Sequence, residues 1–288
     1  MINYSIVIPH KNNPELLSRC LKSIPAREDI EIIIVDDCSE DTKRPQIDRE
    51  DATVITLTKV ESKGAGHARN VGIKKSIGKW LLFADCDDYY YPAFIEELDR
   101  FVDSNYDIIF YDYGTNIKRD SISLFKRTLY TMQRGGKVER ANFKHLLNAP
   151  WNKMYKADFI KANNIEFEEI PIQNDAYFVH KASSLTDNFY YTDKELYFYE
   201  INNNGITLSK KRSIDDIKIS IDTMLKVDKL KALSNAWGTI VLWVPKYKSF
   251  INDYGLLFVL NIYIKRIKIG LLYFQLRKML WKIKTLLH

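Results

Sequence analysis

The stretch Trp80–Pro92, with the sequence WLLFADCDDYYYP, decides the expected fold. It begins with five apolar residues, the length and type expected for a strand that is buried on both faces. Three carboxylates follow within four residues, at Asp85, Asp87 and Asp88. Carboxylates packed at the end of a buried strand repel one another and lose hydration, so a divalent cation that bridges them to phosphates would relieve the strain. The alternative is an acidic turn that caps the next helix, because Asp is common in turns and at N-caps.

Strand and helix patterns alternate on both sides of this stretch. Strands are expected at 4–8, 31–35, 52–58 and 107–111, and helices at 14–24, 67–77 and 92–102. This alternation indicates βαβ units, and therefore an α/β fold with a mostly parallel sheet and flanking helices. Such sheets bind ligands at the carboxyl ends of their strands. Pro9, Asp36 and the 63–69 loop all follow strands in this way, which favours the functional interpretation of the acidic cluster.

The later part of the chain has a looser pattern. Residues 116–140 are polar and basic, residues 166–175 are acidic and expected to be extended, and residues 189–200 form an aromatic strand pattern. A helical pattern begins at Ser213 and continues toward the C-terminus.

Several classes of protein are disfavoured by composition. The three cysteines (Cys20, Cys38 and Cys86) show no CxxC spacing, which argues against a disulfide framework or zinc site and indicates a reducing compartment. The first apolar run is too short for a signal peptide, and no run reaches the roughly 18 uncharged apolar residues of a spanning helix. The sequence from Gly64 to Arg69 matches GxGxxG in part, which is a weak signal for dinucleotide binding.

The net charge of +6 is concentrated near the C-terminus. Residues 246–288 contain nine Lys or Arg and one acid, so the rest of the chain is slightly acidic and predicts no nucleic-acid partner. Apolar residues from Ile269 to Leu287 recur at helical spacing between lysines and arginines. This is typical of a basic amphipathic helix on an anionic membrane, and the alternative is a helix packed on the catalytic domain.

Taken together, these motifs resemble the family-two glycosyltransferases of the GT-A fold, which build bacterial polysaccharides. Four stretches carry the resemblance: SIVIPHKN (5–12) with LLSRCLKSI (16–24), EIIIVDDCSEDT (31–42), KGAGHARNVGIKKSIGKWLLFADCDDYYYP (63–92), and WNKMYKADFI (151–160) with QNDAYF (173–178). The polar stretch 205–209 is similar to the family's donor-covering loop. The resemblance implies a catalytic domain over 1–212, with nucleotide-sugar binding in about 1–115 and the acceptor side in 116–212, followed by a helical extension over 213–288.

The resemblance also implies a binding site for a UDP-sugar. Pro9 and Asp36 are expected beside the base, Arg69 and Lys63 along the base and phosphates, and Asp85 toward the ribose and metal. Asp85-Cys86-Asp87 is similar to the family's DxD motif, and Trp151 and Lys153 are similar to acceptor-side or pyrophosphate-side residues.

Metal binding and catalysis are assigned to two further acids by the same resemblance. Asp87 is expected to bind Mn²⁺ or Mg²⁺ directly, and Asp175 is expected to be the catalytic base. The acid pair that holds the base is Asn174-Asp175 here, where the family more often has Glu-Asp. A second departure is Pro-His-Lys-Asn after the first strand, where the family more often has Pro-Val-Tyr-Asn.

The resulting hypothesis is an inverting, metal-dependent glycosyltransferase. It would transfer a sugar from UDP to a saccharide or lipid-linked glycan, in the synthesis of a surface polysaccharide such as a capsule or lipopolysaccharide. We expect it in the cytoplasm, at the inner face of the cell membrane, held by the basic C-terminal helix. The alternatives are a sugar-nucleotide nucleotidyltransferase and a non-catalytic scaffold that binds glycan at the membrane.

Overall fold

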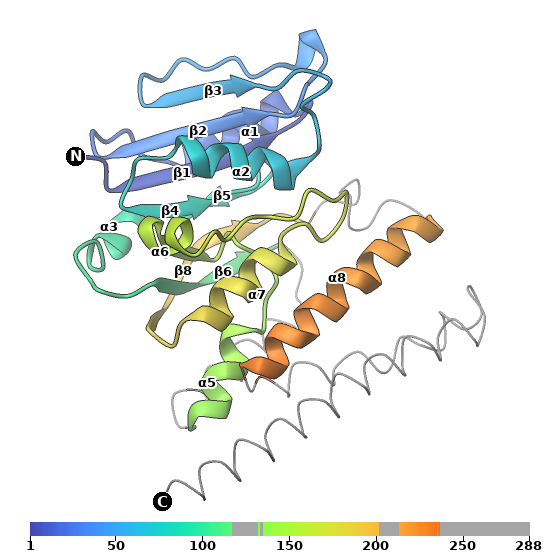
Figure 1. Ribbon diagram of the computed structural model, residues 1–288. Coiled ribbons are helices and arrows are strands. Elements are labelled where there is room, and N and C mark those ends of the chain that lie inside the picture. The colour runs from blue at the N-terminus through green and yellow to red at the C-terminus, as the bar shows by residue number, and fades with distance from the viewer. Residues whose placement is uncertain (117–131, 133–134, 202–212, 235, 237–288) are drawn as a thin grey trace, which may run out of the picture. The chain divides into compact units, whose positions relative to one another are not determined.

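A computed structural model describes residues 1–116, 132, 135–201, 213–234 and 236 of the 288. The chain divides into two compact units (Figure 1). Unit 1 contains residues 1–118 and 149–213, and unit 2 contains residues 119–148 and 214–288. None of the helices in the described ranges is long and apolar enough to cross a membrane.

Unit 1 is built on one sheet of eight strands, in the order β3-β2-β1-β4-β7-β6-β8-β5. The strands are β1 (Tyr4–His10), β2 (Ile30–Asp36), β3 (Ala52–Thr56), β4 (Trp80–Phe83), β5 (Tyr89–Tyr90), β6 (Ile108–Thr115), β7 (Lys153–Lys156) and β8 (Phe189–Tyr199). The first four strands in this order are all parallel. β7 is antiparallel to both of its neighbours, β6 and β8 are parallel, and β5 is antiparallel to β8. The predicted α/β fold is confirmed, with a sheet that is parallel on one side and mixed on the other.

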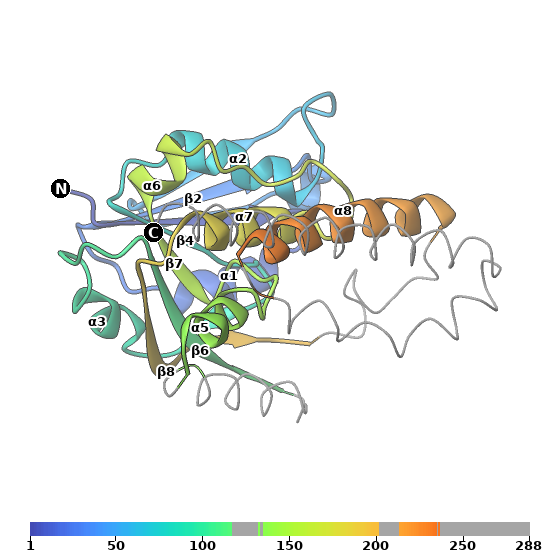
Figure 2. The ribbon, with the colours of Figure 1, turned by 60° about the horizontal axis from the view of Figure 1, so that its bottom comes forward.

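Helices cover both faces of this sheet. Those of unit 1 are α1 (Pro14–Lys22), α2 (Ala65–Lys75), α3 (Phe94–Asp99), α6 (Ala157–Ala162) and α7 (Ala176–Leu185). Figure 2 shows α2 and α6 on one face of the sheet and α1 and α3 on the other. Both neighbours of β1 are strands and both of its faces are covered, which explains why all seven residues of β1 are buried.

An aromatic cluster supports the carboxyl end of β4. The Phe83 ring packs edge-on against Phe167 and Phe178, with centroids 5.1 and 5.4 Å away, and the rings of Phe167 and Phe178 stack at 3.9 Å. Tyr155 of β7 completes the group at 5.9 Å from Phe83. The cluster joins β4, β7, α7 and the segment before α7, and so it fixes the position of the loop that leads into α7.

Two predicted element boundaries were wrong. β1 was expected to stop before Pro9, but it continues through Pro9 to His10. The backbone of Val7 faces β4 and accepts a hydrogen bond from Ala84, so Pro9, two residues on, faces the same side beyond the end of β4. The missing N–H of Pro9 therefore costs the sheet no ladder bond. The helix expected over 92–102 is shorter, because α3 begins only after Ala93, whose φ is 62°.

Unit 2 contributes α5 (Lys137–Lys144) and α8 (Ile214–Leu233). His145 follows α5 and is fully buried. Its pKa is well below the ordinary histidine value, first because burial disfavours the charged ring and then because Lys231 and Lys144 repel it. The predictions for the 205–209 loop and for the basic helix after 246 lie outside the described residues, as does most of 116–140.

Candidate active site

The acidic cluster lies directly after β4, as the sequence indicates. Asp85 keeps 31% of its side chain exposed, whereas Asp88 is fully buried. The Asp88 carboxylate accepts hydrogen bonds from the Tyr197 hydroxyl, at 2.8 Å, and from the backbone N–H of Glu200, at 2.8 Å. The same Tyr197 hydroxyl accepts the backbone N–H of Asp85 at 3.0 Å. Asp88 therefore fastens the acidic loop to β8, which is a structural role that is different from capping a helix.

Negative charge is concentrated in this loop. Burial raises the pKa of Asp88 well above its usual range, and the charges of Asp85 and Asp87 raise it further. The Cys86 thiol behaves similarly, since burial first and then the neighbouring Asp87 and Asp85 raise its pKa. The charges of Asp85 and Asp87 thus disfavour ionisation of both Asp88 and Cys86. A bound cation would reduce the negative potential that these charges create.

The loop fits the requirements of a divalent cation in part. Asp85 and Asp87 offer oxygen donors, the type that Mg²⁺ and Mn²⁺ prefer. The described residues contain no group of three or more His, Cys, Asp or Glu side chains placed to hold a metal ion. Mg²⁺ is commonly held by one or two carboxylates together with substrate phosphates, so two acids are sufficient when a diphosphate supplies the other oxygens.

Arg69 links the acidic loop to a distant segment. It lies on α2, is 5% exposed, and pairs through Nη2 with Oδ1 of Asp85. Its Nη1 donates to Oδ1 of Asn174 at 2.9 Å. The guanidinium lies 5.3 Å from the centroid of the Phe167 ring. Its Nε is buried and has no hydrogen-bond partner in the structure, so this cation is not fully satisfied by the protein.

The N-terminal part of α2 is fastened to the segment before α7. The amide side chain of Asn70 donates to the Phe167 carbonyl at 2.9 Å and accepts the Phe167 N–H at 2.8 Å. At Gly66 the two backbones approach so closely that a Cβ would lie 2.1 Å from the carbonyl oxygen of Glu168. Gly64, which precedes α2, has a φ of 91°, a conformation that favours glycine. These contacts explain the glycines of the 64–66 loop without a dinucleotide.

Asp175 immediately precedes α7, at the end of that segment. Its side chain is partly exposed and forms no capping hydrogen bond with the helix. Loss of hydration is the largest cause that raises its pKa, the Arg69 charge opposes this, and the Asp85 charge raises it again. Asp175 is therefore a carboxylate of increased basicity that is not used for capping, as a proton acceptor requires.

Lys153 is the second unusual titratable group near Asp175. It is 1% exposed, and its ammonium donates to the Ala149 carbonyl and to Oδ1 of Asn152, both at 2.6 Å. Burial lowers its pKa to about 7, against an opposing contribution from Asp175. The expectation that Lys153 lies toward the acceptor or pyrophosphate stays a prediction. The two hydrogen bonds of its ammonium lie within its own segment, and the ammonium also lies 5.4 Å from the centroid of the Phe110 ring of β6.

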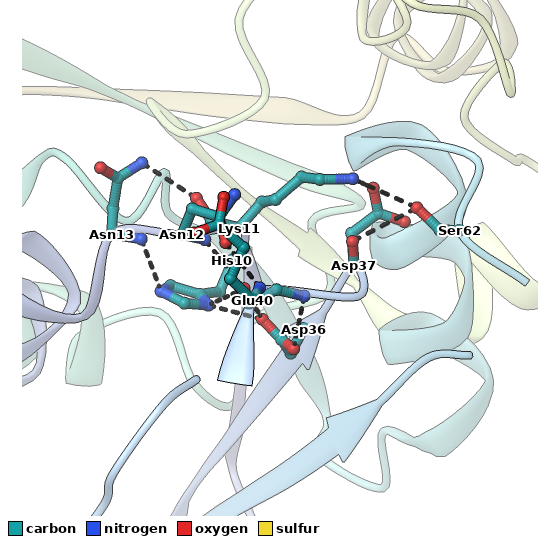
Figure 3. A network of polar contacts seen from close by, with 9 residues as sticks. His10, Lys11, Asn12, Asn13, Asp36, Asp37, Glu40 and Ser62 are labelled. Atoms are coloured by element: carbon teal, nitrogen blue, oxygen red, sulfur yellow. Dashed lines mark hydrogen bonds and ion pairs between the residues drawn. The ribbon is translucent and has the colours of Figure 1, made fainter. Parts of the chain in front are cut away.

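A second polar cluster lies at the ends of β1 and β2 (Figure 3). Nε2 of His10 accepts the backbone N–H of Asn13 at 3.2 Å, so Nδ1 carries the proton and donates to Oδ1 of Asp36 at 2.7 Å. The Asp36 carboxylate also accepts from the hydroxyl and the backbone N–H of Ser39. His10 and Asp36 are both buried. The sequence places Asp36 beside a nucleotide base; in the structure its oxygens are occupied by the protein itself.

The neighbouring acid, Asp37, faces a different set of donors. Lys11 extends toward it and toward Ser62 (Figure 3), with Nζ 3.1 Å from Oδ2 of Asp37 and 3.2 Å from Oγ of Ser62. The backbone N–H of Gly64 donates to the other oxygen, Oδ1, at 3.3 Å. Asp37 therefore connects β1, β2 and the loop that enters α2.

Lys63 forms an ion pair with Glu169, an acid to which the sequence assigned no role. Its Nζ lies 3.0 Å from Oε2 of Glu169, while Nδ1 of His67 lies 2.7 Å from Oε1 of the same carboxylate. The hydrogen bond from His67, and then that from Lys63, lower the pKa of Glu169. This cluster spans about a hundred residues of sequence and connects the start of α2 to the segment before Asp175.

The structure brings together some of the predicted site residues and separates others. Arg69 contacts Asp85 and interacts electrostatically with Asp175. Lys63 has its described contacts with Glu169, and Asp36 has its contacts at the β1–β2 corner. Sequence reasoning missed the roles of Tyr197, Glu169, Asn70, Phe167 and His10. His10 could be noticed in the sequence, because it departs from the residues that the family more often has after the first strand. The other four residues carry no local signal, because their partners lie far away in the sequence.

Comparison with known proteins adds an independent finding. The sequence profile of the family described as Glycosyl transferase family 2 matches residues 5–163, more than half of the chain. The matched range includes β1 to α6 and therefore the loop after β4.

Individual relatives are glycosyltransferases. The chain is 25% identical over 219 residues to the poly(ribitol-phosphate) β-N-acetylglucosaminyltransferase TarS of Staphylococcus aureus, covering 73% of this chain and 37% of TarS. It is 24% identical to the putative glycosyltransferase EpsH of Bacillus subtilis, covering 82% of this chain and 77% of EpsH. The chain thus spans about a third of the length of TarS and most of EpsH.

Solved structures agree on the fold. The structure of S. aureus TarS 1–349 in complex with UDP-GlcNAc superposes with a TM-score of 0.61 at 19% identity, covering 87% of this chain and 79% of that one. A longer TarS structure gives a TM-score of 0.62 and covers 85% of this chain and 45% of that one. The GT-A fold expected from the sequence is therefore confirmed.

Proposed function

The chain belongs to glycosyl transferase family 2, and from this premise we propose that it transfers a sugar from a UDP-sugar to a glycan acceptor, with inversion at the anomeric carbon. The observation that carries the proposal is the Arg69 bridge. It joins an acid of the DxD loop, Asp85, to the segment that ends in the candidate base, Asp175. One cation thus links the elements that would hold the donor and activate the acceptor.

Asp175 is the proposed catalytic base. A sugar hydroxyl is a weak nucleophile, so a carboxylate must accept its proton as it attacks the anomeric carbon. A pKa raised by loss of hydration makes Asp175 a better proton acceptor than an exposed acid, while the positive charge of Arg69 opposes that rise and favours the ionised form. Attack by one activated hydroxyl, opposite the leaving diphosphate, inverts the configuration in a single displacement.

The leaving diphosphate requires positive charge. Arg69 would supply positive charge beside the acidic loop, and Asp85 and Asp87 would hold a Mn²⁺ or Mg²⁺ ion. When bound, such an ion supplies charge stabilisation to the leaving phosphate oxygens. We further propose that Pro9 and Asp36 line the base side of the donor pocket and that Lys63 adds charge along the phosphates.

The donor and acceptor classes are supported by the relatives. TarS has been crystallised with UDP-GlcNAc and with UDP, which favours UDP-sugars over GDP- or dTDP-sugars. Two relatives, TarS and a Bacillus spizizenii β-glucosyltransferase, are named for poly(ribitol-phosphate). We therefore propose a bacterial surface polymer or its lipid-linked precursor as the acceptor, at the inner face of the membrane, with the basic sequence expected to form an amphipathic helix over about 269–287 as the membrane contact.

The two alternatives are less well supported. A sugar-nucleotide nucleotidyltransferase would need a glycine-rich basic loop after β1, whereas this chain has the compact His10–Asn13 turn there. A non-catalytic scaffold would have no reason to keep Asp175 beside Arg69 and Asp85. Both alternatives predict no release of UDP from a UDP-sugar.

The test is a screen of UDP-, GDP- and dTDP-sugars for nucleotide release and transfer, with and without Mn²⁺. We expect metal-dependent turnover of a UDP-sugar. Asp175→Asn should reduce kcat by about 10²–10⁴-fold. In that variant UDP with Mn²⁺ should still raise the melting temperature, as it does in the wild type. Turnover near the wild-type rate in Asp175→Asn rules out the base assignment, and stabilisation by UDP without metal rules out the metal dependence.

A further inference from the structure

Asn174 stands where the family more often has an acid, and its side chain meets Arg69. Arg69 can only donate, so the side-chain atom that faces Nη1 at 2.9 Å must be the amide oxygen of Asn174. The other end of the guanidinium fork is taken by the carboxylate of Asp85. Arg69 thus has one charged and one neutral partner.

The position of Asn174 is set by the backbone. Its carbonyl accepts the N–H of Glu168 at 3.1 Å, which closes the loop before α7. The Cβ of Asn174 also borders the place where Gly66 comes close to this loop. The side-chain amide also donates to the Ile170 carbonyl at 3.5 Å, so a carboxylate of the same shape would keep an oxygen toward the guanidinium and lose only this long hydrogen bond.

The charge at this position affects Asp175, which follows it in the chain. The charged and titratable groups that act on Asp175 are Arg69 from α2, Asp85 from the loop after β4, and Lys153 and Tyr155 from β7. Arg69 stabilises the ionised form and Asp85 opposes it. A second carboxylate on Arg69 would share the same cation and oppose ionisation of Asp175 more strongly.

We propose that Asn174 is a positioning residue, which holds the Arg69 guanidinium between Asp85 and Asp175 with a neutral oxygen and so keeps its positive charge available to the catalytic base. The inference rests on the proposed function. It concerns this chain in particular, because the amide replaces an acid. A neutral partner preserves the geometry of the bridge and leaves one carboxylate, Asp85, to neutralise the cation.

The decisive variant is Asn174→Asp, which has the same shape and keeps an oxygen toward Arg69. The added charge should move the acidic limb of the kcat/KM profile upward by about one pH unit, with kcat above that limb close to wild type. Asn163→Asp is the matched control, since it adds the same charge at an exposed position next to α6. That control should leave the profile unchanged.

The same shift is measurable without turnover. Titration of the Asp carboxyl carbons by NMR, with the Asp175 signal assigned through Asp175→Asn, should give a higher pKa for Asp175 in Asn174→Asp than in the wild type. The NMR titration tests the role of Asn174 separately from the proposed function. A protein that transfers no sugar would contradict the proposed function, and its Asp175 pKa would still show whether the added charge at position 174 acts on Asp175. An unchanged Asp175 titration in a folded Asn174→Asp protein overturns the inference.

A second variant, Asn174→Ala, tests the positioning role if Asn174→Asp does not fold. Asn174→Ala removes the oxygen without adding charge, and Arg69 then loses one of its two anchors. We expect kcat to fall about tenfold and the KM for the donor to rise by a smaller factor, because the misplaced guanidinium serves both Asp175 and the leaving diphosphate. Wild-type kcat in Asn174→Ala overturns the positioning role.

Discussion

Acidic groups follow both β2 and β4 at the carboxyl ends of the strands, and the two places differ in how the protein satisfies these groups. At the β1–β2 corner, Asp36 is buried among neutral donors, the ring of His10 and the backbone and hydroxyl of Ser39. At the β4 end, the acids lie next to one another, and burial together with mutual repulsion raises the pKa of Asp88. At the first corner the protein itself satisfies the Asp36 oxygens, so this corner would be a preformed wall of the proposed donor pocket. The β4 end contains charge that a ligand would neutralise.

This difference between the two places indicates where a ligand could gain binding energy. A carboxylate whose oxygens already accept three hydrogen bonds gains little from a new partner and loses much when its partners are removed. A crowded set of acids behaves in the opposite way, because the carboxylates repel one another and a bound cation would reduce that repulsion. We therefore expect mutations at the first corner to affect stability most, and mutations near the β4 end to affect pH dependence and ligand binding.

The largest expected effect is at the β1–β2 corner. Asp36→Ala should lower the free energy of unfolding by about 2–4 kcal/mol, because His10 and Ser39 keep buried donors without an acceptor. Urea unfolding at pH 7 measures it. Asp41→Ala is the control, since the Asp41 side chain is 86% exposed, and it should cost less than about 0.5 kcal/mol. Equal costs in the two variants would show that the corner is not self-contained.

The next effect concerns the lysine near the β4 end. Because the pKa of Lys153 is about 7 in the folded protein and 10.5 when unperturbed, the unfolded chain binds more protons between these values. The free energy of unfolding of the wild type should therefore rise with pH through this window, relative to Lys153→Met, by about 2–3 kcal/mol from pH 6 to pH 9. Urea unfolding at both pH values measures the difference.

Lys156→Met is the control for that measurement. Lys156 lies at the end of the same strand and is partly exposed, so its replacement should change the free energy of unfolding by a similar amount at pH 6 and pH 9. A Lys153→Met variant that follows the control at both pH values would contradict a buried, weakly basic lysine.

The smallest effect is expected where α2 meets the segment before α7. Glu169→Gln removes the charge that pairs with Lys63 and His67, and it should cost less than about 1 kcal/mol because the Lys63 and Glu169 side chains are partly exposed to water. The lowered pKa of Glu169 means that its contribution is present above the ordinary glutamate pKa and is lost as the pH falls through the lowered value.

Salt provides the check on this last prediction. Added NaCl should reduce the difference between Glu169→Gln and the wild type, because exposed charges are screened. A cost above about 2 kcal/mol, or one that does not change with salt, would mean that Glu169 belongs to the buried framework.

Much of the fold could be predicted from local patterns. The alternation of apolar strands with amphipathic helices gave the positions of β1 to β4 and α2 within a few residues. The exceptions depend on strand pairing: Pro9 stays in β1 because its missing N–H faces the side beyond the end of β4. The antiparallel β7 could not be placed in this way, because nothing in the residues 153–156 says which strands they join.

The sequence by itself determined which chemical groups follow which strand, because a buried strand and the acids after it are adjacent in the chain. The tertiary structure decided which of those groups meet. Asp88 pairs with Tyr197 across 109 residues, Arg69 with Asn174 across 105, and Asn70 with Phe167 across 97. Such pairs depend on the packing of whole elements, and the residues that form them need no periodicity of their own. The local pattern therefore predicts an acidic loop, and the fold places the Arg69 guanidinium between this loop and the segment that ends in Asp175.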